Sequence, residues 1–212
     1  QNFLLDENRI KLIQRDTNSG KPAIAKNEAL KYINGVYIAF LDSDDLWMED
    51  KLEIQINVME SNNHLGLTYT GGYWIDSSDN IIKKFMPRYE CGYNLSNQLK
   101  RYEINNQSVI ITKNALDKTL QHFNESITIG EDYNLYINIV ALYESCAIKE
   151  YLVQYRIHEN AITKRKKQIT DGVLVTLKEI NNKYNIKTKY SLWYFLTYLK
   201  AIRFKYIKKN WN

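Results

Sequence analysis

Three carboxylates at the end of an apolar run are the residues of this sequence best placed to do chemistry. The run extends from Val36 to Leu41, and Asp42, Asp44 and Asp45 follow it within four residues. A short apolar run of this kind predicts a buried strand, and open α/β sheets bind ligands at the carboxyl ends of their strands. Carboxylates this close repel one another unless a cation lies among them. Their oxygens suit Mg2+ or Mn2+, which are usually held by few carboxylates together with substrate phosphates.

Two other interpretations of these aspartates remain open. Asp42 or Ser43 would also suit as the cap of the helix predicted for residues 46–59, because side-chain oxygens cap helix N-termini, and capping does not exclude metal binding. A calcium-binding loop would use Asp42, Asp44 and Glu53 as its first, third and twelfth positions. That loop needs glycine at its sixth position, where this chain has Trp47, so the calcium interpretation is disfavoured.

The sequence FLDSDDLW, followed by MEDKLE, resembles the metal-binding segment of family 2 glycosyltransferases with the GT-A fold. In that family an Asp-x-Asp motif follows a buried strand and holds the divalent ion of a nucleotide-sugar. The resemblance implies that Asp42 and Asp44 bind Mn2+ or Mg2+, and that Asp42 and Asp45 belong to the nucleotide-sugar site. Three further segments match the family in the same order along the chain.

The first of these matches is a loop and helix near the start of the chain. Residues 18–27 resemble the family segment Asn-x-Gly-x-x-x-Ala-Arg-Asn, which implies nucleotide-sugar contacts from Lys26, Asn27 and the nearby Lys21. Lys26 replaces the usual arginine, so the charge is kept while a bidentate guanidinium contact is lost. The alternative is that both lysines are ordinary solvated side chains.

The second match lies at the start of a predicted helix. Residues 129–136 resemble the Glu-Asp motif of the family, whose Asp is the usual general base of inverting members. The resemblance therefore makes Asp132 the catalytic base, with Glu131 as its neighbour. Acidic residues at a helix N-terminus are stabilising whatever their function, so this position alone would not indicate catalysis.

The third match closes the family domain. Residues 156–162 resemble the segment Tyr-Arg-x-His-x-x-Ser, in which a histidine reaches the metal or the diphosphate in some members. The resemblance implies metal binding by His158, and Arg156 would neutralise phosphate. A lone histidine is more often structural or solvated, and this alternative stays open for His158.

The periodicity of the chain predicts alternating strands and helices. The expected strands cover residues 10–13, 36–41, 64–69, a stretch from 73, 81–85, 107–112 and, at the sheet edge, 147–155. The expected helices cover residues 23–33, 46–60, stretches from 113 and from 131, 172–184 and 191–209. Leu52, Ile56 and Met59 would form the core-facing stripe of the second helix. Residues 76–80 predict a hairpin turn, and the polar residues 86–106 predict a mobile active-site loop.

The fold class that these elements and the resemblance imply is α/β, with a GT-A-like mixed sheet flanked by helices and a basic helical C-terminal tail. Two parts are expected, a glycosyltransferase domain over residues 1–163 and a basic amphipathic extension over 164–212. The family normally begins with strands and an Asp-containing turn that hold the base and ribose. Nothing in residues 1–15 matches them, so the domain is expected to be N-terminally incomplete.

Charge divides the chain into an acidic body and a basic tail. Lys and Arg outnumber Asp and Glu by fourteen to three in residues 156–212, whereas residues 1–155 have fifteen against twenty-one. Residues 191–209 combine aromatic and basic side chains with a roughly helical period. One predicted stripe of that helix consists of Trp193, Leu196, Leu199, Ile202 and Tyr206. Such a helix would lie on an anionic membrane surface, or would pack on the core or a second subunit.

The sequence also sets expectations for the cellular setting. No run of eighteen uncharged apolar residues exists, so no transmembrane helix is predicted. The N-terminal residues contain no secretory signal. Cys91 and Cys146 have no metal-binding spacing, which favours reduced cysteines and a cytoplasmic protein, peripheral on the inner face of the membrane. No nucleic-acid partner is expected, because no nucleic-acid-binding motif accompanies the basic tail.

Together the motifs predict a metal-dependent, inverting glycosyltransferase of the hexosyl or N-acetylhexosaminyl type. It would move sugar from a nucleotide diphosphate sugar, with a UDP-sugar as the expected donor, to a saccharide or lipid-linked acceptor in surface polysaccharide or glycolipid biosynthesis. Two other classes remain. A nucleotidyltransferase would need a Gly-rich basic signature near its first strand, which is missing, and an inactive binding or scaffold subunit would bind nucleotide without turnover.

Overall fold

The computed structural model describes residues 10–119, 122–157, 166–185 and 191–206 of the 212-residue chain. Its strands are β1 (Tyr37–Ala39), β2 (Leu46–Trp47), β3 (Leu65–Ile75), β4 (Ile81–Phe85), β5 (Ile110–Thr112) and β6 (Glu144–Arg156). Its helices are α1 (Pro22–Leu30), α2 (Lys51–Glu60), α3 (Leu95–Lys100), α4 (Lys113–Lys118), α5 (Glu131–Leu142), α6 (Lys166–Tyr184) and α8 (Ser191–Tyr206), with a 3-10 turn, η2 (Asn106–Ser108). The expected α/β class is confirmed.

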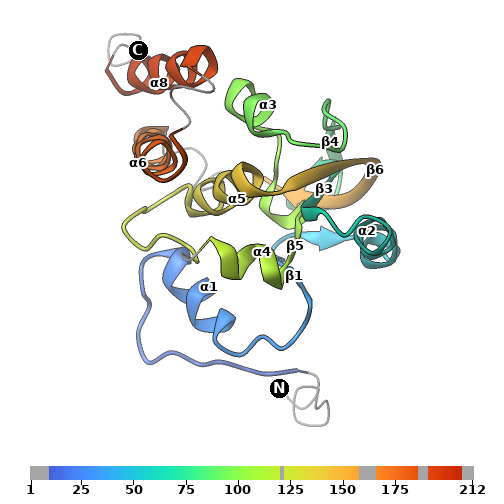
Figure 1. The fold of residues 1–212 in the computed structure, drawn as a ribbon. Helices are drawn as coiled ribbons and strands as arrows, with labels where there is room; N and C mark the ends of the chain where they lie inside the picture. Colours follow the sequence, from blue (N-terminus) through green and yellow to red (C-terminus); the bar gives the residue numbers. More distant parts are fainter. Residues whose placement is uncertain (1–9, 120–121, 158–165, 186–190, 207–212) are drawn as a thin grey trace.

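The strands form one mixed sheet in the order β1-β5-β3-β6-β2, and β4 pairs with β3 beside this path. The long strands β3 and β6 run parallel, whereas the other pairs are antiparallel. The prediction that residues 147–155 form an edge strand was wrong, because β6 lies between β3 and β2. Helices α4, α5 and α6 lie on one side of the sheet, as Figure 1 shows.

The strand β3 is longer than expected, since it continues through Gly71 and Gly72 where a break was predicted. The pairing of β3 with β6 shifts register at these glycines. A Cβ atom on Gly72 would lie 2.5 Å from the Val153 side chain and backbone, so glycine is required for the close approach of the strands. The hairpin turn that follows at residues 76–80 is confirmed, with Asp76 N donating to Asn80 O.

Two expectations about the first third of the chain were wrong. Residues 10–13 form no strand, and the predicted strand 36–41 shrinks to the three residues of β1. In the described part of the chain β1 pairs only with β5, which leaves it at one end of the sheet. Ile38 is buried there, but Val36 is 67% exposed, so the apolar run is only partly covered.

The predicted helix 46–60 begins five residues late. Leu46 and Trp47 pair with β6 as strand β2, and Met48 N donates to Leu152 O just beyond them. These bonds hold the chain against the sheet before α2 starts. Of the expected stripe only Met59 is buried, whereas Leu52 is exposed and Ile56 is half-buried. The buried face of the helix consists of Lys51, Gln55 and Met59.

Lys51 is fully buried, and no hydrogen-bond partner for its Nζ lies among the described residues. The ammonium lies 4.3 Å from the centre of the Trp47 ring. Burial lowers the pKa of Lys51 from 10.5 to about 7, because the charged form loses its hydration. At any pH below 10.5, lysine is mostly charged in the unfolded chain. Burial of Lys51 therefore destabilises the folded state in that pH range.

Replacing Lys51 by Met is expected to raise the free energy of unfolding by about 2–4 kcal/mol near pH 6. The gain should be complete below about pH 7 and should vanish as the pH rises to 10.5, where lysine is neutral in both states. Urea unfolding of the parent chain and the variant at pH 6 and at pH 10.5 measures this difference in stability. The exposed Lys83 provides the matched control, Lys83→Met. A loss of stability in Lys51→Met would mean that the contact with Trp47 outweighs desolvation.

Residues 86–106 contain more regular structure than expected, because helix α3 lies within them. Cys91 and Cys146 form a disulfide, and Gly92 pairs with Ser145 beside it. The expectation of two unpaired thiols is therefore wrong for this structure. The disulfide and the bridge join the segment to β6, which sets the position of the residues that follow α3. Motion of this segment stays a prediction.

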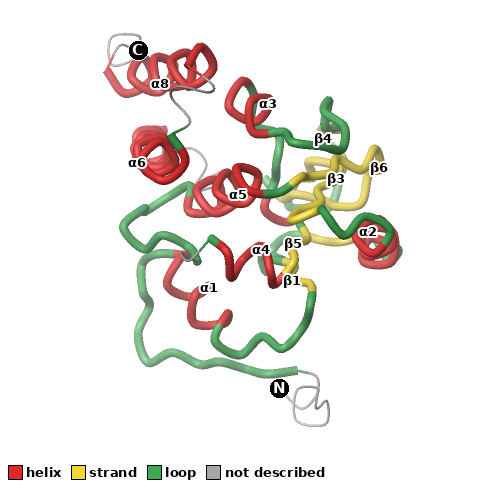
Figure 2. Tube along the Cα trace, in the orientation of Figure 1, coloured by secondary structure: helices red, strands yellow, loops and turns green. Residues whose placement is uncertain are grey.

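The C-terminal helices pack on the body of the protein, and Figure 2 shows them beside α5 and α3. In α6, Leu177 and Ile180 are fully buried. Asn134 of α5 donates to Glu179 Oε2 at 2.9 Å, which joins α6 to the helix that begins at Glu131. The expected helix over 172–184 is confirmed, and the division of the chain at residue 163 stays a prediction. No helix among the described residues is long and apolar enough to cross a bilayer.

Candidate functional site

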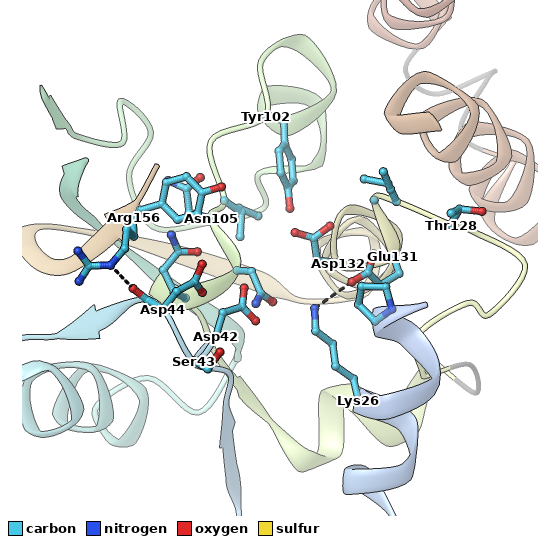
Figure 3. Close-up of a pocket in the computed structure, with 17 residues that line it drawn as sticks. Lys26, Asp42, Ser43, Asp44, Tyr102, Asn105, Thr128, Glu131, Asp132 and Arg156 are labelled. Carbon is cyan, nitrogen blue, oxygen red and sulfur yellow. Dashed lines mark hydrogen bonds and ion pairs between the residues drawn. The ribbon is translucent and has the colours of Figure 1, made fainter. Parts of the chain in front are cut away.

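A pocket of about 710 Å³ lies where the segment after β1 faces the start of α5 (Figure 3). Its walls come from five parts of the chain: α1, the segment after β1, the segment after α3, the start of α5 and the end of β6. The lining residues are Pro22, Lys26, Asp42, Ser43, Asp44, Tyr102, Ile104, Asn105, Asn106, Gln107, Thr128, Ile129, Gly130, Glu131, Asp132, Tyr155 and Arg156. The pocket thus brings together two of the acidic motifs found in the sequence.

The aspartates after β1 divide into two that line the pocket and one that does not. A turn in which Asp45 N donates to Asp42 O directs Asp42 and Asp44 toward the pocket. Asp45 is buried, and its Oδ1 accepts a hydrogen bond from Arg156 N at 2.7 Å. Burial raises the pKa of Asp45 to about 6, and the charges of Asp44 and Asp42 add to the effect. Asp45 therefore fixes the loop instead of lining the pocket.

The fit of a divalent ion can be judged from the oxygen donors on this wall. Asp42 and Asp44 supply carboxylates that are exposed to the pocket, and Mg2+ and Mn2+ are commonly held by one or two carboxylates with phosphates and water. Among the described residues no group of three His, Cys, Asp or Glu could hold a metal without such outside ligands. His158, predicted as a further ligand, lies outside the described residues. The two carboxylates fit an ion that arrives with a diphosphate.

The side chain of Arg156 is occupied by protein contacts. Its Nε donates to Asp44 O at 2.8 Å and its Nη1 to Asp76 O at 2.7 Å. Its Nη2 lies 2.6 Å from the Asp79 carboxylate at the tip of the β3–β4 hairpin. The arginine lines the pocket, and it also joins the loop of the aspartates to the hairpin. Phosphate binding by Arg156 stays a prediction.

Asp132 stands in the first turn of α5, on the opposite side of the pocket from Asp42, as Figure 3 shows. Gly130 precedes the helix with a φ of 94°, a left-handed conformation that favours glycine and turns the chain into α5. Burial raises the pKa of Asp132, the charge of Glu131 adds to the rise, and Lys26 opposes it. A carboxylate that holds its proton more tightly than usual is suited to act as a base.

Glu131 is buried and forms an ion pair with Lys26, with 2.9 Å between Nζ and Oε1. This pair joins α1 to the first turn of α5 at the pocket wall (Figure 3). Lys26 was predicted to contact the nucleotide-sugar. In this structure the ammonium of Lys26 is paired with Glu131, and this ion pair holds the start of α5.

Lys21 and Asn27 are not among the residues that line the pocket. Lys21 Nζ donates to Glu125 O at 2.7 Å. Asn27 Nδ2 donates to Phe123 O at 2.8 Å, and Asn27 Oδ1 accepts from Phe123 N at 2.9 Å. Both side chains join α1 to residues 123–125. Their predicted contacts with a nucleotide-sugar stay predictions.

One wall of the pocket was not identified residue by residue from the sequence, although residues 86–106 were predicted to form an active-site loop. Tyr102, Asn105 and Asn106 line it after α3. The position of this wall depends on distant contacts, because Tyr136 OH donates to Asn106 Oδ1 at 2.8 Å. No periodicity or local motif marks these residues, so their role became visible only in the fold.

Comparisons with known proteins support one family. The model for the family described as Glycosyl transferase family 2 matches residues 1–116. WfgD of Escherichia coli, a UDP-Glc:alpha-D-GlcNAc-diphosphoundecaprenol beta-1,3-glucosyltransferase, is 36% identical over 163 residues, covering 76% of this chain and 60% of WfgD. An uncharacterized glycosyltransferase of Methanocaldococcus jannaschii is 30% identical over 165 residues, covering 76% of this chain and 56% of that protein. The chain thus spans about three fifths of the length of these relatives.

A more distant relative covers more of the chain. TuaG of Bacillus subtilis, a putative teichuronic acid biosynthesis glycosyltransferase, is 28% identical over 197 residues, which are 92% of this chain and 74% of TuaG.

Solved structures show the same fold. S. aureus TarS 1-349 matches with a TM-score of 0.69 and 16% identity, covering 94% of this chain and 56% of that one. Its complex with UDP-GlcNAc matches with a TM-score of 0.64 and 17% identity, covering 81% of this chain and 50% of that one. At this identity the likeness concerns the fold alone, which is the GT-A arrangement of a mixed sheet with flanking helices. With the family match over more than half of its length, the chain belongs to glycosyltransferase family 2.

Proposed function

We propose that this chain carries the catalytic site of a glycosyltransferase that moves a sugar from a nucleotide diphosphate sugar to a hydroxyl group. The observation that carries the proposal is the pocket, in which Asp42 and Asp44 face Asp132 across a space of about 710 Å³. Pockets of this volume take ligands of the size of a nucleotide-sugar. One wall then offers metal-binding carboxylates for the diphosphate, and the other offers a base for the acceptor.

The reaction would be a single displacement at the anomeric carbon. Asp132 takes the proton from the acceptor hydroxyl as its oxygen attacks, and the bond to the diphosphate breaks on the opposite side. The configuration of the anomeric carbon is therefore inverted. The ion pair of Glu131 with Lys26 holds the first turn of α5, and hence Asp132, in place. Mn2+ or Mg2+, held by Asp42 and Asp44, would stabilise charge on the departing diphosphate.

The names of the relatives guide the choice of substrates. WfgD is named for a UDP-Glc donor and a diphosphoundecaprenol-linked acceptor, and the TarS structure contains UDP-GlcNAc. We take a UDP-hexose or UDP-N-acetylhexosamine as the donor. The acceptor is a saccharide or a lipid-linked saccharide of a surface polysaccharide or glycolipid, met on the cytoplasmic side of the membrane.

Replacing Asp44 by Ala is expected to weaken binding of UDP-GlcNAc in the presence of Mn2+ by about 100-fold, since the ion loses one of its two protein ligands. Calorimetry with and without Mn2+ measures this. The control is Asp117→Ala, which removes an exposed aspartate of α4 and should leave affinity unchanged. Equal affinity of Asp44→Ala and the parent chain would contradict the metal site.

An assay of the reaction products separates the proposal from its alternatives. An inactive binding subunit would bind the UDP-sugar with Mn2+ but would never release UDP, with or without an acceptor. A nucleotidyltransferase would consume a nucleoside triphosphate and a sugar phosphate, releasing pyrophosphate. UDP release that depends on Mn2+ and on a saccharide acceptor supports the transferase.

A further inference from the structure

Helix α8 has two different faces. Tyr194, Thr197 and Ala201 face the body of the protein, where Ala201 is buried and Thr197 Oγ1 donates to Leu99 O of α3. The opposite face carries Leu192 and Phe195, which are 59% and 55% exposed. Figure 1 shows α8 at the outer margin of the protein, next to α6 and α3. The helix is thus anchored by one face, and its other face has no cover among the described residues.

The exposed face of α8 is apolar from Leu192 to Leu199. Leu192, Phe195 and Leu199 follow one another at the i, i+3, i+7 spacing that puts side chains on one line of a helix. Tyr198 is exposed beside them. Single exposed leucines are common on protein surfaces, whereas a continuous apolar line usually marks a contact surface. We call Leu192, Phe195, Tyr198 and Leu199 the outer face of α8.

The structure changes the composition of the stripe predicted from the sequence. Leu196 and Ile202 are only half-buried, and the side chains of Trp193 and Tyr206 lie outside the described part of the chain. Leu199 is the member of that stripe that the outer face shares. Tyr194 and Ala201 pack on the core, while the outer face stays exposed. One face of α8 can therefore pack on the core while the other contacts another surface.

The charge of α8 indicates what kind of surface would cover it. The helix contains no Asp or Glu over Ser191–Tyr206. Lys200 and Arg203 are exposed, and Lys200 Nζ also donates to Lys100 O of α3 at 3.4 Å. Arg203 lies four residues beyond Leu199, on the same side as the outer face. An apolar line bordered by cations fits a surface that is apolar inside and anionic at its edge. The headgroup region of a bilayer with anionic lipids has this structure.

We propose that the outer face of α8 docks on an anionic bilayer. Leu192, Phe195 and Leu199 enter the interface, while Lys200 and Arg203 lie at the headgroup phosphates. The helix would lie in the plane of the membrane, with Tyr194 and Ala201 still packed on the protein. The proposal rests on the proposed function in one respect, since docking brings the pocket to the membrane that contains a lipid-linked acceptor.

The test uses the full chain and sedimentation with vesicles of phosphatidylcholine alone or mixed with phosphatidylglycerol. Binding is expected only with the anionic mixture, and it should weaken about tenfold or more when the salt concentration is raised well above physiological. The double variant Phe195→Gln, Leu199→Gln should lose at least about tenfold in binding, because two apolar side chains no longer enter the interface.

The matched control is the double variant Ile81→Gln, Ile82→Gln on β4. These isoleucines are 55% and 56% exposed, much like Phe195, but belong to another surface. The control should bind vesicles as the parent chain does. Equal loss in both variants, or equal binding to neutral and anionic vesicles, would overturn the proposal. Thermal unfolding of each variant verifies that it is folded.

A second copy of the chain is the competing occupant of this face. Sedimentation velocity without lipid distinguishes it, because a dimer that the Phe195 and Leu199 substitutions dissociate would overturn membrane docking. Calorimetry of UDP-GlcNAc with Mn2+ keeps the two proposals apart. If the α8 variant loses vesicle binding but keeps its affinity for UDP-GlcNAc, only the function of α8 is affected. If the parent chain does not bind UDP-GlcNAc, the proposed function is contradicted, whatever the vesicle assay shows.

Discussion

Replacing Asp132 by Asn is expected to lower the rate of sugar transfer by about 10²- to 10⁴-fold, which is the usual contribution of a general base. The amide keeps the shape of the carboxyl group but cannot take the proton of the acceptor. Binding of UDP-GlcNAc with Mn2+ should be almost unchanged, because Asp42 and Asp44 are on the other side of the pocket. Transfer assays and calorimetry on the same preparations measure the two effects.

The pH dependence gives an independent check of Asp132. Burial and the charge of Glu131 raise its pKa, and the base must be ionised to act. The parent rate should therefore fall as the pH drops through this raised pKa, and Asp132→Asn should lack that limb. The control Asp117→Asn changes an exposed aspartate of α4. If Asp132→Asn transferred sugar within about tenfold of the parent chain, Asp132 would have a structural role only.

The parts of the fold that follow from local signals could be predicted from the sequence. The helix at Glu131, the hairpin turn at residues 76–80 and β5 with the helix after it were all expected. Their signals are short-range, such as the family-like Glu-Asp motif at a helix start or turn residues between two apolar runs. The errors concern elements whose extent depends on distant partners. Strand β3 continues through Gly71 and Gly72 because β6 approaches them closely.

The same division holds for the pocket. Motifs identified Asp42, Asp44 and Asp132, which line it, because each motif is a contiguous stretch. Asp45 stands in the same motif yet turns inward to Arg156 N, a contact made across 111 residues. The position of the wall with Tyr102 depends on the packing of α3 and on the hydrogen bond that Tyr136 of α5 donates to Asn106. Such long-range contacts leave no periodic trace in the sequence, which is why that wall was predicted only as a loop.

Replacing Lys26 by Met is expected to destabilise the protein by about 3 kcal/mol, because the buried Glu131 loses its counter-charge. The substitution should also change catalysis. Lys26 holds down the pKa of Asp132, so without it the pKa rises further and the acid limb of the rate profile moves to higher pH. Thermal or urea unfolding measures the first effect, and transfer rates across pH measure the second.

Three matched variants separate this buried ion pair from an ordinary surface one. Lys113→Met breaks the exposed pair with Asp117, also on a helix, and should cost no more than about 0.5 kcal/mol. Lys26→Arg keeps the charge and should retain most of the stability, since the family segment that residues 18–27 resemble has arginine there. Lys26→Met combined with Glu131→Leu should recover much of the loss, because no buried charge is left unpaired. Should Lys26→Met unfold within about 1 kcal/mol of the parent chain, the pair would not be what holds α1 to the first turn of α5.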